Sequence, residues 1–93
     1  MPFISCAKKH ASEWRFPGGA SDNKLYFGGH VEFDPDIPEE FQMLLFDPQT
    51  SGGLLLGVPE IKITELLTTA EDAGISVWDV GEVVDGDQIV VKA

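Results

Sequence analysis

The chain has 93 residues, of which 43% are hydrophobic and 10% aromatic, a composition that excludes an intrinsically disordered segment and is typical of one small globular domain. Sixteen Asp and Glu against six Lys and Arg give a formal net charge of −10. Such a surface repels nucleic acids and anionic membranes, because binding to phosphates relies on Lys and Arg. We expect a single domain over residues 1–93 that binds neither nucleic acid nor a membrane.

A single cysteine, Cys6, cannot form an internal disulfide, as is usual in reducing compartments. No apolar run approaches the ~20 residues that a membrane-spanning helix needs. The N-terminus carries no basic segment followed by an apolar one, so no signal peptide is visible. These features predict a cytoplasmic protein.

The first third of the chain predicts a helix, a loop and a strand. Apolar residues at three- to four-residue spacing predict an amphipathic helix over residues 3–14, with Ser5 as its cap. Residues 16–23 are rich in Gly, Ser, Asp and Asn and are expected to form a loop. Residues 24–33 are expected to be extended, with a bulge or hairpin turn at Gly28-Gly29.

A stiff connector and a short helix follow. Two prolines in residues 34–38 restrict the backbone, and the second suits the first turn of a helix over residues 39–45. Glu39 and Glu40 then lie where the helix dipole favours negative charge. With Asp34 and Asp36 they form an acidic run that lacks the spacing of a calcium loop. A solvated turn and helix start is the favoured interpretation.

The C-terminal half predicts a strand, a helix and a hairpin. Residues 54–58 are apolar at every position, as in a strand covered on both faces. The next helix runs from residue 59 or 60 to residue 73 and ends at Gly74 in a left-handed cap. A strand over residues 77–84, the turn Asp85-Gly86 and a strand over residues 88–91 would form an antiparallel hairpin. The expected fold is α+β, an α/β sandwich with a small mixed sheet and helices packed on it.

Residues 47–53 combine turn formers with hydrogen-bonding side chains. They read Asp47, Pro48, Gln49, Thr50, Ser51, Gly52 and Gly53. Asp, Ser and Thr commonly satisfy backbone groups in tight turns, so an ordinary structural turn is the favoured interpretation of these residues alone. The alternative is an anion site made by backbone N–H groups in a concave nest, because the glycines lead into an expected strand and not into a helix N-terminus.

Catalytic and metal-binding patterns are otherwise missing from the chain. His10 and His30 have no second His or Cys at ligand spacing, so no zinc site is expected. Cys6 is expected to be an inert thiol. No phosphate-binding Gly-rich motif of the P-loop or dinucleotide type occurs, and no Ser, His and Asp can be grouped as a triad.

Three segments resemble one enzyme family. Residues 47–53, with Leu-Leu after them, resemble the signature near the C-terminus of the selenide, water dikinases, which belong to the aminoimidazole ribonucleotide synthetase superfamily. Residues 16–20 followed by Asn23 resemble the family's Pro-Gly-Gly segment and its downstream Asn. Residues 80–83 resemble the superfamily's closing strand. Order and spacing agree from about Pro2 to the end of the chain.

The resemblance implies the C-terminal part of an enzyme that makes selenophosphate from selenide, water and ATP with Mg²⁺. It implies that the N-terminal nucleotide-binding domain, which carries the family's reactive Cys or selenocysteine and its Lys, is absent from these residues. No catalytic residue or metal ligand is then expected here, and Cys6 lies on a different element from the family nucleophile. ATP and Mg²⁺ would belong to the full-length enzyme, and the isolated chain would bind no cofactor and be inactive.

The resemblance places residues 47–53, called the signature stretch below, at the cleft between two domains. The residues implied to lie near substrate or phosphate are Asp47, Gln49, Thr50, Ser51, Gly52 and Gly53, with Gly18, Gly19 and Asn23 bordering the same cleft. One alternative is a non-catalytic binding or regulatory module of the same fold. Another is a different ATP-using member of the superfamily, which the intact signature disfavours. A domain lacking its first strand and helix would expose a sheet edge and an apolar face, so we expect a homo-oligomer.

Overall fold

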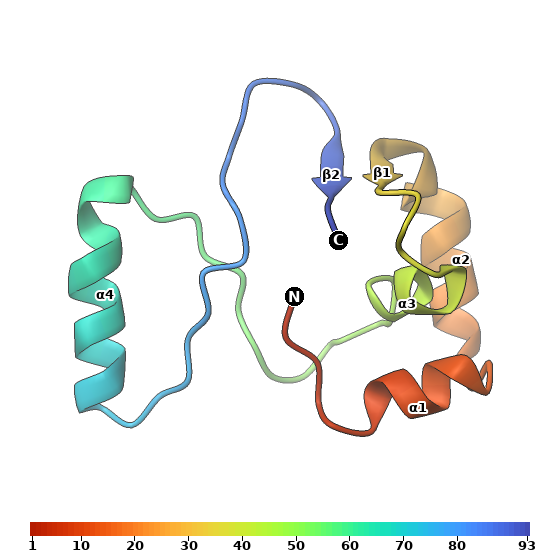
Figure 1. The fold of residues 1–93 in the computed structure, drawn as a ribbon, viewed down its shortest axis with the longest axis horizontal. Helices are drawn as coiled ribbons and strands as arrows, with labels where there is room; N and C mark the ends of the chain where they lie inside the picture. Colours follow the sequence, from red (N-terminus) through yellow and green to blue (C-terminus); the bar gives the residue numbers. More distant parts are fainter. The chain divides into compact units, whose positions relative to one another are not determined.

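The computed structural model describes residues 1–93, which form short helices and one very small sheet (Figure 1). The elements in chain order are α1 (Ala7–Ser12), α2 (Gly18–Phe27), the 3₁₀ turn η1 (Gly28–His30), β1 (Val31–Phe33), α3 (Glu39–Leu44), α4 (Glu60–Asp72) and β2 (Ile89–Val91). The α+β expectation is confirmed at this level. No helix combines the length and the apolar character needed to cross a bilayer.

The chain divides into two compact units. One comprises Phe3–Ser51 and Asp85–Ala93 and is called the core unit below. The other comprises Met1–Pro2 and Gly52–Val84 and is called the α4 unit. The boundary between them falls inside the signature stretch, between Ser51 and Gly52.

The hydrophobic core of the core unit is formed by residues of α1, α2, β1, α3 and the segment that follows α3. Helices α1 and α2 both pack on α3. The buried hydrophobic side chains here are Ala11, Ala20, Met43 and Phe46. The ring of Phe46 meets that of Phe33 in β1 edge to face, with 5.9 Å between their centroids. Phe46, which directly precedes the signature stretch, is therefore part of the hydrophobic core.

The sheet consists of β1 and β2 in parallel, with Val31 opposite Ile89 and Phe33 opposite Val91. The Asp34 N–H donates to the Val91 carbonyl at 2.8 Å and extends the ladder by one bond. The predicted antiparallel hairpin through Asp85-Gly86 is wrong, because residues 77–84 form no strand and residues 89–91 pair with β1 instead.

In the α4 unit the predicted helix is confirmed, with Ala70 buried and Ile63 and Leu66 half-buried along one stripe. Gly74 ends it in the left-handed conformation, at φ 68°. The Gly74 N–H donates to the Glu71 carbonyl at 3.0 Å and the Ile75 N–H to the Ala70 carbonyl at 2.9 Å. This pair of bonds is a Schellman motif, as the sequence predicted for a glycine cap.

The strands predicted at residues 54–58 and 77–84 are wrong. Neither segment pairs with another, and Leu54, Leu55 and Val83 expose 89%, 85% and 95% of their surface. A strand needs a neighbour to accept and donate its hydrogen bonds, whereas a helix satisfies its own backbone groups internally. An apolar run therefore forms a strand only where a partner strand lies alongside.

The loop predicted over residues 16–23 is wrong for residues 18–23, which lie in α2. The extended segment predicted over residues 24–33 is confirmed only at Val31–Phe33, which is β1, because residues 24–27 also belong to α2. Pro17 is extended at φ −67° and ψ 152° and stands at the cap position. The two following glycines occupy the first turn, and Ala20 is completely buried. Burial of Ala20 outweighs the low helix propensity of glycine. Gly28-Gly29 continue α2 into a 3₁₀ turn and form no bulge.

The first and third helices are shorter than predicted. Helix α1 covers residues 7–12, and Cys6, not Ser5, stands at its cap position without a side-chain hydrogen bond. It ends in the same Schellman geometry as α4, but the left-handed position is held by Trp14 at φ 54°. The bonds run from Trp14 N–H to the Ala11 carbonyl at 2.8 Å and from Arg15 N–H to the His10 carbonyl at 3.0 Å. Helix α3 ends one residue before its predicted end.

Candidate functional site

The signature stretch is open to solvent. Asp47 is half-buried, and residues 48–53 are all exposed. The backbone amides of residues 49–53 donate to no carbonyl of the chain, and the side chains of Gln49, Thr50 and Ser51 make no hydrogen bond within it. Gly52 and Gly53 have φ of 89° and 68°, conformations that other residues rarely adopt. The stretch therefore presents hydrogen-bond donors that its own chain does not use.

The base of the stretch, in contrast, is firmly held. The Phe46 N–H donates to the Met43 carbonyl at 3.1 Å, and the Phe46 carbonyl accepts from the Asn23 amide at 2.9 Å. Phe46 exposes only 7% of its surface. Its ring, its N–H and its carbonyl are thus all engaged one residue before Asp47.

Gly19 lies against Pro48, the second residue of the stretch. A Cβ atom at position 19 would lie 3.0 Å from Cγ of Pro48, closer than ordinary van der Waals contact. A Cβ at Gly18 would meet nothing within 4 Å. Positions 19 and 23 are one helical turn apart and lie on the same side of α2. The structure therefore brings Gly19 and Asn23 to the base of the stretch, while Gly18 makes no such contact.

A shallow hollow of about 250 Å³ opens beside this base in the core unit. The residues around it are Asn23, Phe27, His30, Val31, Leu45, Phe46, Asp47 and Ile89. Asn23 and Asp47 were singled out by the sequence. His30 and Phe27 were not, because no spacing signal connects them with residues 46 and 47, and only the turn at η1 brings them near.

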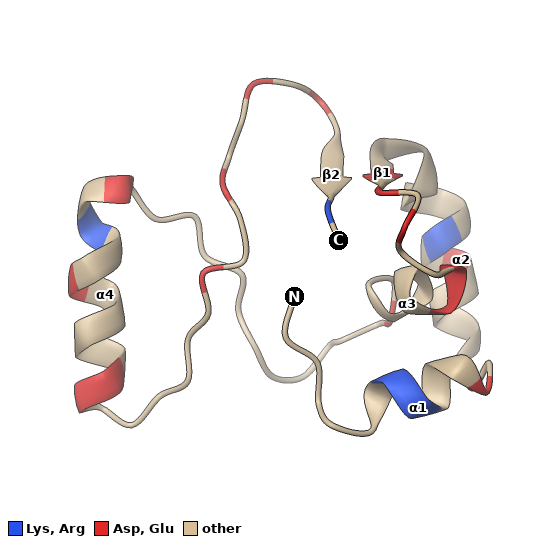
Figure 2. Cartoon of the chain, in the orientation of Figure 1, with Lys and Arg blue, Asp and Glu red and all other residues tan.

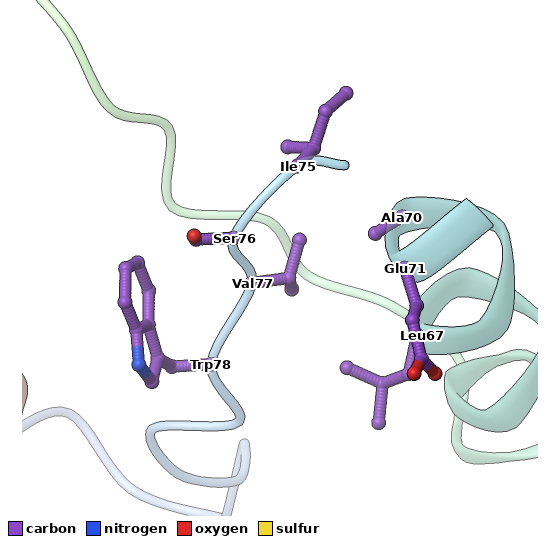
Figure 3. Close-up of a pocket in the computed structure, with 7 residues that line it drawn as sticks. All are labelled: Leu67, Ala70, Glu71, Ile75, Ser76, Val77 and Trp78. Atoms are coloured by element: carbon purple, nitrogen blue, oxygen red, sulfur yellow. The ribbon is translucent and has the colours of Figure 1, made fainter. Parts of the chain in front are cut away.

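A second hollow, of about 390 Å³, lies in the α4 unit beside the end of α4 (Figure 3). Val77 points toward the helix, and the Trp78 indole lies on the other side of its segment (Figure 3). The residues around it are Leu67, Ala70, Glu71, Ile75, Ser76, Val77 and Trp78. None of them was a predicted site residue, and the hollow is lined by both polar and apolar groups.

Acidic residues occur in both units and basic ones are few (Figure 2). The acidic run at the start of α3 behaves as a turn and helix start: Asp34 Oδ1 accepts the Asp36 N–H at 3.0 Å. Glu39 pairs with Lys24 of α2 at 2.8 Å. The structure contains no group of three or more His, Cys, Asp or Glu side chains that could hold a metal ion. The Cys6 thiol is free and exposed.

Comparison with known proteins identifies relatives across almost the entire chain. A selenide, water dikinase of Carboxydothermus hydrogenoformans is 38% identical over 99% of the chain, which spans 27% of that protein. Those of Pelobacter propionicus and Pseudomonas aeruginosa are 40% and 33% identical over 88% and 99% of the chain, which spans 26% of each. The chain is related to the selenide, water dikinase family. It covers about a quarter of the length of the relatives that it matches.

No protein-family model matches the sequence, and no solved structure matches the chain. The relationship to selenide, water dikinases therefore rests on sequence identity. The aminoimidazole ribonucleotide synthetase-like fold stays a prediction, because the small parallel sheet and its helices establish only an α+β structure.

Proposed function

We propose that the chain is the C-terminal portion of a selenide, water dikinase and that its signature stretch forms part of the wall of the site where selenophosphate is made. The observation that carries this proposal is the contrast within the stretch. Its base at Phe46 is held by a buried ring and two hydrogen bonds, whereas residues 49–51 present unused donors to solvent. Donors that the chain leaves free, next to a base that is held in place, are suited to anionic oxygens.

The donors of residues 49–51 are neutral: backbone N–H groups, the Gln49 amide and the hydroxyls of Thr50 and Ser51. They fit phosphate or selenophosphate oxygens, as in backbone nests. No Lys or Arg lies between residues 47 and 53, and the chain carries a net charge of −10. Most of the positive charge that a phosphate group needs must therefore come from elsewhere. In the full-length enzyme ATP would supply the phosphoryl group, and Mg²⁺ would neutralise part of its charge.

The role of this chain in the reaction is accordingly to bind and orient oxygen atoms. The nucleotide-binding domain, the nucleophile and the metal ligands belong to the remaining three-quarters of the protein. The isolated chain is expected to be inactive, to reside in the cytoplasm as part of its parent enzyme, and to associate with further copies through its exposed apolar residues.

A segment exchange tests the proposal. The matching quarter of the Carboxydothermus hydrogenoformans enzyme is replaced by this chain, and ATP-dependent selenophosphate formation is followed by phosphorus NMR. We expect the chimera to be active and Thr50→Val to lower its turnover by about 10²-fold, the usual loss of one transition-state donor. Gly53→Val should also lower it, because valine does not tolerate φ 68°.

Thr68→Val is the matched control, since the Thr68 hydroxyl is exposed and donates to the Thr64 carbonyl of its own helix at 2.9 Å. This variant should leave turnover unchanged. A folded chimera that makes no selenophosphate, or one in which Thr50→Val and Gly53→Val turn over normally, would contradict the proposed role of the stretch.

A further inference from the structure

We infer that Gly19 and Asn23 are positioning residues: they do not touch the substrate but fix the direction in which the signature stretch leaves the core unit. The catalytic consequence of this inference rests on the proposed function. The geometric part, that α2 orients residues 49–51, stands independently of it.

Asn23 acts on the peptide unit that precedes Asp47. Its amide donates to the Phe46 carbonyl at 2.9 Å in a partly buried setting. Because the peptide unit is planar, fixing this carbonyl also fixes the plane that contains the Asp47 N–H. The same bond occupies one donor of Asn23 with the chain itself, so this donor is not free to hold a substrate oxygen.

Gly19 acts on the next residue by leaving room for it. Cγ of Pro48 would stand 3.0 Å from a Cβ at position 19, and Cβ of Pro48 would stand 3.6 Å from it. The proline ring can change its pucker, but because it is closed onto the backbone it cannot swing aside as an open, flexible side chain would. A side chain at position 19 therefore requires the Pro48 ring, its backbone or α2 to move by a few tenths of an ångström.

The two contacts act together because they lie on one side of α2 and meet consecutive parts of the stretch. Beyond Pro48 no hydrogen bond within the chain holds residues 49–51. The contacts at Phe46 and Pro48 are therefore the ones that set where residues 49–51 begin and in which direction the chain enters them. A change on α2 should reach the donors of Gln49, Thr50 and Ser51 without any contact between them.

The geometric part is tested in the 93-residue chain by recording the backbone amide NMR signals of residues 49–51. We expect Gly19→Ala to shift them and Gly18→Ala, on the same helix with open space around it, to leave them in place. The double variant Gly19→Ala/Pro48→Ala should show the shifts that Pro48→Ala alone produces, with no added effect of the alanine at 19. In that background the remaining contact is at an ordinary 3.6 Å. Equal shifts from Gly18→Ala and Gly19→Ala, or the same Gly19→Ala effect with and without Pro48, would overturn the inference.

The catalytic part is tested in the active chimera. Asn23→Asp keeps the shape of the side chain and removes the donor, so we expect kcat to fall about 10-fold with KM for ATP unchanged, the pattern of a lost transition-state interaction. Ser21→Asp adds the same charge at an exposed position of α2 and should change neither constant. Loss of melting temperature alone, with kcat intact, would reduce Asn23 to a structural role. If the chimera is inactive while the NMR shifts occur as expected, the proposed function fails and the geometric inference stands.

Discussion

Both units of the molecule contain apolar segments, but the two units bury these residues to different extents. Four of the five buried hydrophobic residues, Ala11, Ala20, Met43 and Phe46, lie in the core unit, and only Ala70 lies in the α4 unit. Both units expose large apolar side chains, such as Leu25 in the core unit at 87% and Leu54 and Ile61 in the α4 unit at 89% each, but only the core unit also buries several. Helix α4 forms without a substantial core, whereas the apolar segments beside it form no strand. Helices depend on local bonds, but strands and cores depend on what lies next to them.

The ends of two helices extend this comparison. Helices α1 and α4 close with the same Schellman bonds, yet Gly74 holds the left-handed position in the α4 unit and Trp14 holds it in the core unit. A bulky residue at φ 54° carries a conformational cost of roughly 1–2 kcal/mol. Trp14 meets the Phe16 ring edge to face at 5.9 Å, a contact that offsets part of that cost. The core unit thus tolerates backbone strain that side-chain packing compensates.

The largest expected difference between the units is the effect of removing one large apolar side chain. Phe46→Ala deletes a ring that is 7% exposed and packs on Phe33, and should lower the free energy of unfolding by about 3–5 kcal/mol. Leu54→Ala, at a residue that is 89% exposed, should change it by less than about 0.5 kcal/mol. Urea denaturation followed by circular dichroism measures both. Equal effects would show that the two units are buried to a similar extent in solution.

Self-association should come mainly from the α4 unit. Its exposed leucines and valines offer apolar area to a second copy, while the net charge of −10 opposes contact. We expect concentration-dependent association in sedimentation equilibrium that strengthens as salt screens the charge. Leu55→Ser should weaken it by up to about 1.5–3 kcal/mol, the value of one fully buried leucine.

Leu25→Ser is the control, because Leu25 is 87% exposed but belongs to the core unit. It should weaken association less than Leu55→Ser does. A strictly monomeric profile at high concentration would contradict the expectation of a homo-oligomer, and a larger effect of Leu25→Ser would place the contact on the core unit.

The sequence predicted well what local chemistry determines. The bounds of α4, its glycine cap and the turn at Asp34 all follow from residues within a few positions of one another. The predictions from the sequence failed where contacts between distant residues determine the local structure. Helix α2 was predicted as loop and strand because the burial of Ala20 and the fit of Gly19 against Pro48 cannot be read from neighbours.

The candidate site shows the same division. The open stretch with its glycines was predictable from its own residues. The bond from Asn23 to the Phe46 carbonyl joins positions 23 residues apart, and His30 reaches the same hollow only through the turn at η1. The last strand was predicted to pair antiparallel within its own hairpin, but it pairs in parallel with β1, a partner that its neighbouring residues do not specify.

Substitutions at the two helix caps should change the stability by an intermediate amount. Gly74→Ala places a Cβ in the left-handed region and should destabilise α4 by about 1 kcal/mol. Gly57→Ala, in the same unit with open space around it and no positive φ, should have little effect. Trp14→Gly should be close to neutral, because relief of backbone strain is offset by loss of the contact with Phe16. Thermal unfolding followed by circular dichroism distinguishes these outcomes, and a neutral Gly74→Ala would argue against the Schellman cap.

The smallest expected effect is that of the ion pair between α2 and α3. Lys24 Nζ lies 2.8 Å from Glu39 Oε1, and the two side chains expose 35% and 62% of their surface. Water screens such a pair, so its coupling energy in a double-mutant cycle of Lys24→Gln and Glu39→Gln should be at most about 0.5 kcal/mol. The Lys62–Glu65 pair in the α4 unit, with side chains that are 62% and 68% exposed, should give a still smaller value. Both values should fall as salt is added, because screening weakens exposed pairs most. A coupling above about 1 kcal/mol for Lys24–Glu39 would show that the ion pair between α2 and α3 is more deeply shielded from water than its exposure indicates.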